Sequence, residues 1–363
     1  MPVHHLVTGS WTPPGALFTL SFDDETHELK LLKRTALPED EPISWLTKDH
    51  IGRNLYGAAL KRWNSLRVDS PTDIVHEGSH PIGGDPSAPL STTRTRAIFL
   101  LAASQPPHAV YCAPFYEHAG YGNAFSVSPT GTLEANIQNF EYAPESAIHG
   151  AVFNPPETHL YSADMWGDKI WVHVKDSDGT LTTVGSVDTP KGTHPRWVEM
   201  HPSGTVLYTL MEAANTLVEY TIPPQTHLPT PTGQSFPLVP PSLLSSNPKL
   251  YRGDVCALSA SARTLFATTR SNDRNTPGFI TALAVGPDGR ITQQRTLQHT
   301  LSSGGHSNAV VPAPWDEGLL ALTDDVEAVV EVWRWEEGPG VLYRVAREKL
   351  GQDGAGMNVV WLD

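Results

Sequence analysis

The amino-acid sequence predicts an all-β fold, a seven-bladed β-propeller that forms one domain over residues 1–363. Three observations lead to this prediction. Strand-like runs that alternate polar and apolar residues recur from one end of the chain to the other. A block near the middle occurs twice, at a spacing close to that of one four-stranded blade. Finally, the strands left over at the two ends of the chain add up to one complete blade.

The repeated block covers residues 148–176 and residues 194–222. Each copy contains a strand, a Pro-containing turn, a strand that ends Leu-Tyr-x-x-x, an acidic residue, a short polar link and an alternating third strand. Tyr161 and Tyr208 hold the same place in the two copies and lie 47 residues apart. Propeller blades of four strands repeat at about this length. The two copies are therefore predicted to be neighbouring blades.

The remaining strands follow the same rhythm in chain order. Three strands open the chain, LVTGSW, ALFTLSF and ELKLLKR, and one closes it, MNVVWLD. We expect these four to form a single blade, which would also pair the two terminal strand edges. A Pro-rich segment, residues 221–242, is predicted to be an edge strand and a surface loop inside the domain. Between the ends lie six groups of four strands, which begin at ISWLTKD, AIFLLA, Ile148, Arg196, DVCALSA and SNAVVPA.

Composition narrows the class of function. Lys and Arg total 25 against 39 Asp and Glu, which gives a net charge of −14 and argues against a nucleic-acid or membrane-binding surface. The N-terminus lacks the pattern of a secretory signal, and no apolar run is long enough to span a membrane. Cys112 and Cys256 are expected to be buried free thiols, so we expect a cytoplasmic protein. The oligomeric state is left open, a homo-oligomer included.

Propeller topology points to a site near the central axis. The innermost strand of a blade and its neighbour are antiparallel, so the start of the first and the end of the second open on the same face. This rule selects starts at His149, Arg196, Asp254, His306, Asn308 and Asn358. It selects ends at Trp11, Lys61, Tyr116, Asp164, Glu212, Arg270 and Asp324.

These candidates differ in how strongly they indicate a functional rather than a structural role. Any one of them could form a surface salt bridge or line a wet channel, but His149, Arg196, Glu212 and Arg270 together favour a catalytic site. Lys61 could bind an anionic substrate or be a solvated strand end. The GGHSNA segment, with His306 and Asn308, could bind substrate or close its blade as a tight turn. Asp164 and Asp324 are interpreted as turn caps.

The histidines lack metal-ligand spacing, and no GxSxG or P-loop motif is present, so neither a metal nor a cofactor is predicted.

The sequence resembles the fungal 3-carboxy-cis,cis-muconate lactonizing enzymes (carboxymuconate cyclases), within a wider propeller family that has a 6-phosphogluconolactonase branch. The resemblance implies a metal-independent cycloisomerase of protocatechuate breakdown, the β-ketoadipate pathway, acting on a small tricarboxylate. It also implies that the site falls on His149, Arg196, Glu212 and Arg270, with Arg274 as the alternative to Arg270 because the segment SNDRNTPGF after Arg270 is variable. The segments that carry it span nearly the whole chain: DEPISW, SHPIGG, TRAIFLLAA, GYGNAFSV, IHG, HPRW, LMEA, LYRGDVCAL, SGGHSNAV and GMN.

In the implied reaction, Arg196 and Arg270 position substrate carboxylates, and His149 donates a proton with Glu212 as its partner, although Glu212 itself could be the donor. Two other functions remain open at this stage. One is hydrolysis of a sugar lactone such as 6-phosphogluconolactone on the same fold. The other is a non-catalytic peptide-binding propeller, which the absence of a repeated Trp-Asp signature disfavours.

Overall fold

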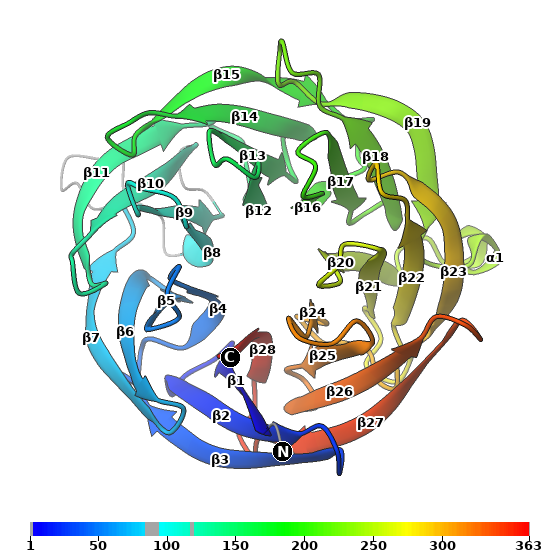
Figure 1. The fold of residues 1–363 in the computed structure, drawn as a ribbon, viewed down its shortest axis with the longest axis horizontal. Helices are drawn as coiled ribbons and strands as arrows, with labels where there is room; N and C mark the ends of the chain where they lie inside the picture. Colours follow the sequence, from blue (N-terminus) through cyan, green and yellow to red (C-terminus); the bar gives the residue numbers. More distant parts are fainter. Residues whose placement is uncertain (1–2, 84–93, 117–119, 363) are drawn as a thin grey trace.

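The computed structural model describes residues 3–83, 94–116 and 120–362. Over these residues, seven four-stranded antiparallel sheets surround a central axis like the blades of a propeller (Figure 1). The prediction of an all-β, seven-bladed propeller is confirmed. In each blade one strand lies next to the axis and three follow outward.

The blades are numbered from the N-terminus. Blade 1 contains β28 (Ala355–Trp361), β1 (Val3–Ser10), β2 (Ala16–Asp23) and β3 (Glu28–Ala36). Blade 2 contains β4 (Ile43–Lys48), β5 (Asn54–Ala59), β6 (Arg62–Ser70) and β7 (Asp73–Pro81). Blade 3 contains β8 (Arg96–Ala102), β9 (Val110–Phe115), β10 (Tyr121–Val127) and β11 (Leu133–Glu141).

Blades 4 and 5 are the two copies of the sequence repeat. Blade 4 contains β12 (Ile148–Phe153), β13 (His159–Asp164), β14 (Lys169–Lys175) and β15 (Leu181–Asp188). Blade 5 contains β16 (Pro195–Met200), β17 (Val206–Met211), β18 (Thr216–Thr221) and β19 (Thr230–Pro237). Blade 6 contains β20 (Tyr251–Leu258), β21 (Thr264–Ser271), β22 (Phe279–Val285) and β23 (Ile291–His299). Blade 7 contains β24 (Val310–Pro312), β25 (Leu319–Asp324), β26 (Val329–Glu336) and β27 (Val341–Lys349).

The ring closes by pairing the two ends of the chain. Strand β28 is hydrogen-bonded to β1 with Leu6 opposite Trp361 and Thr8 opposite Val359. The two termini consequently lie close together in blade 1 (Figure 1). The predicted joining of one C-terminal strand to three N-terminal strands is confirmed.

The Pro-rich segment differs from the prediction in one detail. It does contribute the edge strand β19, but a short helix follows, α1 (Pro241–Ser246), which was not predicted. Pro241 lies in its first turn, where a fixed φ and a missing N–H cost nothing. Leu243 and Leu244 pack against the side chains of Val239, Tyr251 and Phe279. These tertiary contacts stabilise the helix. At this length the helix has no hydrophobic periodicity that could be recognised in the sequence.

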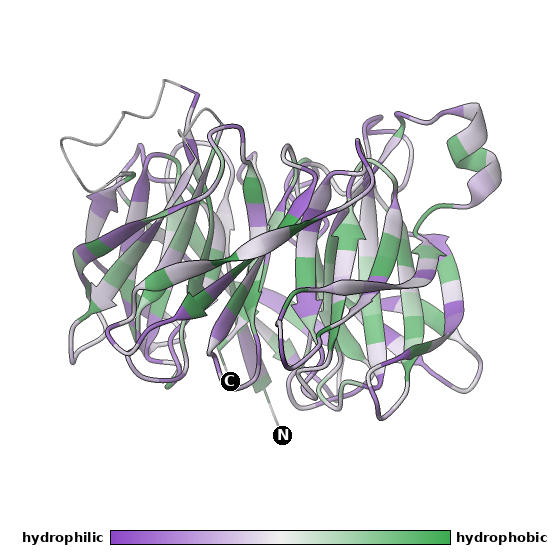
Figure 2. Ribbon diagram, turned by 90° about the horizontal axis from the view of Figure 1, so that it is seen from above, coloured by the Kyte–Doolittle hydropathy of each residue, from purple (hydrophilic) through white to green (hydrophobic). Residues whose placement is uncertain are grey.

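Hydrophobic residues lie mainly within the strands, and hydrophilic ones are more frequent in the loops at both faces of the disc (Figure 2). The second strands are the most deeply buried. Tyr161 on β13 and Tyr208 on β17, the anchors of the repeat, are both fully buried. Cys112 and Cys256 are buried free thiols, as expected. No helix among the described residues is long and apolar enough to cross a membrane.

Four inner strands share an irregularity close to their start. In β12, Ile148 pairs with Asp164 and Gly150 with Ala163, so that His149 is an extra residue without a partner opposite it. Equivalent extra residues are Arg196 in β16, Ser44 in β4 and Ile98 in β8. Strand β20 has one extra residue between Gly253 and Cys256. Such β-bulges redirect a side chain out of the regular alternation, and are frequent beside active sites.

Candidate active site

The four bulged residues meet at one mouth of the central channel. Ser44, Ile98, His149 and Arg196 all line the same cavity, whose volume is about 120 Å³. All seven blades contribute to its wall. The remaining lining residues are Trp11, Trp45, Phe115, Tyr116, Met165, Glu212, Arg252, Arg270, His306, Ser307 and Met357.

Two arginines and two carboxylates form a buried network in this wall. Arg196 Nη2 lies 2.7 Å from Asp254 Oδ1, and Arg270 Nη2 lies 3.1 Å from Glu212 Oε2. The pairs are also cross-linked, because Arg196 Nε lies 3.5 Å from Glu212 Oε2 and Arg270 Nε lies 3.4 Å from Asp254 Oδ1. Each guanidinium therefore contacts both acids. Burial by itself would raise the pKa of Asp254, but Arg270 and Arg196 outweigh it and hold that pKa below its usual range.

His149 contacts this network through its Nε2 atom, which lies within hydrogen-bond distance of Arg196 Nη1. A guanidinium can only donate, so Nε2 is the acceptor and a neutral ring carries its proton on Nδ1. Burial lowers the pKa of His149 well below its usual value, and the charges of Arg196 and Arg270 lower it further. An acid that delivers a proton near neutral pH works best with a pKa close to that pH. The pKa of His149 lies below that range, first because the ring is buried and second because two cations lie beside it.

Arg252 is a site residue that sequence reasoning missed. It is the second residue of β20 and lines the cavity, yet within the described part of the chain its guanidinium makes no hydrogen bond or ion pair. The positive charge of Arg270 and burial lower its pKa to about 10. The predicted strand began three residues late, at Asp254. Period-two alternation from Asp254 back to Arg252 was the available signal.

The three residues predicted to bind substrate lie in different places. The His306 side chain lines the cavity, is 52% exposed, stacks on Trp11 and has Nδ1 2.8 Å from Asp325 Oδ2. Asn308 is buried behind the wall: its backbone N–H donates to Asp254 Oδ2 at 2.6 Å and its side chain to the Thr269 carbonyl. The structure therefore places Asn308 as a support for Asp254.

Lys61 lies outside the cavity lining, and its ammonium donates to the Thr95 carbonyl. Burial and the nearby Arg96 lower the pKa of Lys61. Arg96 itself lies over the face of the Trp11 ring, 3.4 Å from its centre, and donates to the Trp11 carbonyl. Trp11 thus contacts both the Arg96 guanidinium and the imidazole of His306.

Asp164 and Asp324 are turn caps, in agreement with their interpretation from sequence. Asp164 accepts hydrogen bonds from the backbone N–H groups of Ala147 and Gly167, and Asp324 accepts from those of Gly304, Val326 and Glu327.

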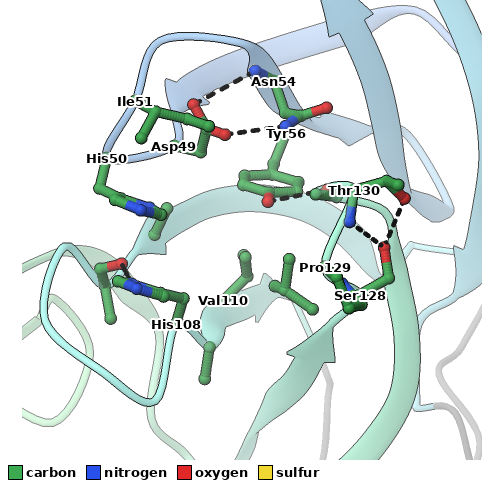
Figure 3. A pocket seen from close by; sticks show the side chains of 15 residues that line it. Asp49, His50, Ile51, Asn54, Tyr56, His108, Val110, Ser128, Pro129 and Thr130 are labelled. Atoms are coloured by element: carbon green, nitrogen blue, oxygen red, sulfur yellow. Dashed lines mark hydrogen bonds between the residues drawn. The ribbon is translucent and has the colours of Figure 1, made fainter.

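A larger cavity, of about 410 Å³, lies between blades 2 and 3 (Figure 3). Its carboxylate, Asp49, is occupied by hydrogen bonds from the side chain of Asn54 and from two backbone N–H groups. Next to Asp49, His50 stacks on His108 with ring centres 3.8 Å apart (Figure 3). No lysine or arginine of the described residues lines this cavity, in contrast to the three arginines of the charged one.

The opposite mouth of the channel opens into an apolar cavity of about 400 Å³. Trp45 lines both this cavity and the charged one. Its ring packs against Trp197 and Phe99, with centres 4.8 Å and 5.6 Å away. Trp45 therefore borders both cavities, and Phe99 and Trp197 line the apolar one. Among the described residues, no three His, Cys, Asp or Glu side chains are grouped so that they could hold a metal ion.

The fold and the pocket together define a seven-bladed propeller with a cationic site on its axis. The chain matches the family described as "Lactonase, 7-bladed beta-propeller" over residues 5–299, and it belongs to that family. It is 54% identical to the carboxy-cis,cis-muconate cyclase of Neurospora crassa over the full length of both chains. It is also 27% identical to muconate cycloisomerase 1 of Cutaneotrichosporon cutaneum, covering 93% of this chain and 92% of that one.

Solved structures show the same fold at low sequence identity. The periplasmic gluconolactonase of Pseudomonas aeruginosa superposes with a TM-score of 0.81 at 16% identity, covering 99% of both chains. A protein from Lactobacillus plantarum superposes with a TM-score of 0.78 at 16% identity, covering 100% of both.

Proposed function

We propose that this protein is a carboxy-cis,cis-muconate cyclase, which interconverts 3-carboxy-cis,cis-muconate and its lactone. The observation that carries the proposal is the 54% identity to the Neurospora crassa cyclase over the entire chain. The pocket supports it independently, because three guanidinium groups converge on a small cavity. Arginine binds carboxylate through two parallel hydrogen bonds, and the substrate carries three carboxylates.

The reaction is an intramolecular addition. A carboxylate oxygen of the substrate forms a bond to a carbon of the conjugated double bond and closes a five-membered ring. The π-electron pair moves toward another carboxylate, which becomes enediolate-like, and the carbon next to it then takes up one proton. Arg196 and Arg270, fixed by Glu212 and Asp254, present preorganised positive charge to the carboxylate that gains electron density.

Proton delivery falls to His149, which acquires its proton when substrate binds. Without substrate, burial and the charges of its two arginine neighbours keep the imidazole neutral. A substrate with three negative charges offsets those cations and raises the pKa of His149, so that the complex takes up a proton. Glu212 keeps the position of partner, because it holds Arg270 and Arg196 close to the ring. Glu212 as the donor itself remains the alternative.

The proposal extends to metal dependence, cellular compartment and pathway. The enzyme works without a metal ion, since the guanidinium groups supply the positive charge that a metal ion would bring. It acts in the cytoplasm, in the breakdown of protocatechuate through the β-ketoadipate pathway, on a small-molecule substrate with no nucleic-acid or membrane partner. The buried free thiols of Cys112 and Cys256 accord with a reducing compartment.

The test uses EDTA-treated protein mixed with 3-carboxy-cis,cis-muconate. We expect loss of the conjugated-diene ultraviolet absorbance, a recovered lactone and uptake of one proton per molecule converted. Unchanged absorbance in both EDTA-treated and metal-supplemented protein would overturn the proposal. Activity that returns only on adding metal would overturn the metal-independent part alone.

Hydrolysis of a sugar lactone is the second candidate function. The likeness to the Pseudomonas aeruginosa gluconolactonase favours it at the level of the fold. The same protein preparation tested with 6-phosphogluconolactone separates the two candidates. Hydrolysis releases a new carboxylic acid and so liberates a proton, whereas cyclisation consumes one.

A further inference from the structure

We propose that Arg252 binds the third carboxylate of the substrate, the one absent from plain muconate, and thereby makes the pocket prefer a tricarboxylate to a dicarboxylate. This inference rests on the proposed function and names a residue that decides its substrate class. It starts from the difference between Arg252 and the other two arginines of the wall.

Arg196 and Arg270 are already engaged inside the protein. Arg196 directs its guanidinium to Asp254 and His149, and Arg270 to Glu212 and the carbonyl oxygen of His306. Both side chains are only 5% exposed. Arg270 Nε has no hydrogen-bond partner but lies 3.4 Å from Asp254 Oδ1. These two arginines can therefore polarise a substrate, but several of their N–H groups are already used inside the protein.

Arg252 has its donors unused. No hydrogen bond or ion pair of the guanidinium is found over the described residues, and its Nε atom is buried without a partner. Unsatisfied buried donors are costly unless a ligand completes them. Because Arg252 lines the cavity, a carboxylate there would meet its planar fork of N–H groups.

The charge count of the pocket leads to the same residue. Arg196, Arg252 and Arg270 face two carboxylates, Glu212 and Asp254, and those two acids contact Arg196 and Arg270. One positive charge is left over, and it belongs to Arg252. Repulsion from Arg270 and burial lower the pKa of Arg252 to about 10, which shows how poorly this charge is compensated. A carboxylate bound there would relieve that repulsion.

Arg252 is also the guanidinium with the least influence on His149. The pKa of His149 responds first to burial, next to Arg196 and Arg270, and only last to Arg252. The reacting carboxylates belong beside the proton donor, so Arg196 and Arg270 are the groups that face the chemistry. The carboxylate that takes no part in bond formation is left for Arg252.

The experiment compares R252M with the parent protein on two substrate pairs. Turnover is measured with 3-carboxy-cis,cis-muconate and with cis,cis-muconate. Binding is measured by calorimetry with butane-1,2,4-tricarboxylate and adipate, their saturated and unreactive counterparts. We expect R252M to lower kcat/KM for the tricarboxylate by about 10²-fold, as the loss of a buried charge-assisted pair implies, and for the dicarboxylate by less than about 3-fold. The Kd of R252M should rise by about the same factors, about 10²-fold for butane-1,2,4-tricarboxylate and less than about 3-fold for adipate.

Two controls accompany the variant. Arg274 is an exposed arginine in the β21–β22 loop. R274M should leave the preference for tricarboxylate over dicarboxylate unchanged, both in kcat/KM and in Kd. This control separates a specific contact from general electrostatic attraction. Because Arg252 is repelled by Arg270, R252M should have a Tm equal to or above that of the parent. R252K, which keeps the charge without the fork, should recover only part of the tricarboxylate preference.

Equal losses on both members of a pair, or no loss on either, would overturn the role of Arg252 while leaving the cyclase activity in place. If the parent protein converts neither muconate, the proposed function falls. A tricarboxylate preference in binding that disappears in R252M would even then support the inference.

Discussion

At the scale of single residues, the site depends on cations that suppress the charge of a neighbouring imidazole. His149 is neutral in the unliganded pocket because it is buried beside Arg196 and Arg270. If it must take up a proton from solvent before it can act, the rate at low substrate concentration depends on the small protonated fraction. That fraction rises tenfold for each unit by which pH falls, as long as pH stays above the pKa.

This argument predicts a particular pH profile. Across neutral pH, log(kcat/KM), which reports the free enzyme, should fall by one unit for each unit of rising pH, because the pKa of free His149 lies well below that range. The plateau of kcat should extend to higher pH, since bound substrate raises the pKa. Stopped-flow measurements at several pH values give both curves. A flat kcat/KM profile from pH 6 to 8 would assign the proton to another group, such as Glu212.

Sequence reasoning located five of the six charged or imidazole side chains that form the network or lie beside it, namely His149, Arg196, Glu212, Asp254 and Arg270, but not Arg252. Topology alone placed His149, Arg196, Glu212 and Arg270 together, because strand starts and ends on one face can be counted. Arg252 escaped since the start of β20 was set at Asp254. The depressed pKa of His149 was beyond reach as well, because it depends on distances between blades that are far apart in sequence.

At the scale of elements, the inner strands carry the site on irregularities. Each of β4, β8, β12 and β16 has one extra residue near its start, and all four extra side chains line the pocket. A sequence pattern cannot reveal this, because a bulge shifts the alternation by one residue and resembles an ordinary strand start. The strands themselves were predictable from alternation, whereas the bulges and α1 depend on contacts across the fold.

Gly150 tests how tightly a bulge is held. A Cβ atom added there would lie 2.8 Å from Trp197 Cε3 and 3.0 Å from the Arg196 carbonyl oxygen, so β12 and β16 would have to separate. Overpacking of this kind costs about 1–3 kcal/mol. We therefore expect Gly150→Ala to lower the free energy of unfolding by that amount, in a denaturant titration, and to lower kcat by displacing His149 and Arg196.

A matched control lies in the same blade. A Cβ atom added at Gly185 on β15 would find its nearest neighbour, Leu228 Cδ2, at an ordinary 3.6 Å. Gly185→Ala should leave stability and turnover close to those of the parent. If Gly150→Ala behaves like Gly185→Ala, the packing of β12 on β16 is looser than the geometry indicates.

At the scale of the whole molecule, an acidic protein of net charge −14 contains a pocket with a surplus positive charge. The net charge argued against a nucleic-acid or membrane-binding surface, but it could not show that Arg196, Arg252 and Arg270 converge. Their convergence depends on the ring, which in turn depends on the pairing of β28 with β1.

The closing strand supplies a whole-molecule prediction. Val359 on β28 is 1% exposed and lies opposite Thr8, while its neighbour Val360 is partly exposed. A carboxylate at residue 359 would be buried and would lose its hydration, so Val359→Asp should cost at least about 3 kcal/mol and lower the Tm of the entire ring in one transition. Val360→Asp should cost clearly less. Differential scanning calorimetry distinguishes this from local fraying, in which the main transition of Val359→Asp would stay in place.

The closure of blade 1 also bears on how the protein is made. Thr8 and Asn358 are hydrogen-bonded across 350 positions of sequence. At a synthesis rate of roughly 5–20 residues per second, β1 leaves the ribosome roughly 20–70 s before the strand that will cover it. Six blades can assemble in that interval, but the inner edge of β1 waits for its partner throughout. The pocket, to which all seven blades contribute, is therefore completed only after translation has passed residue 361.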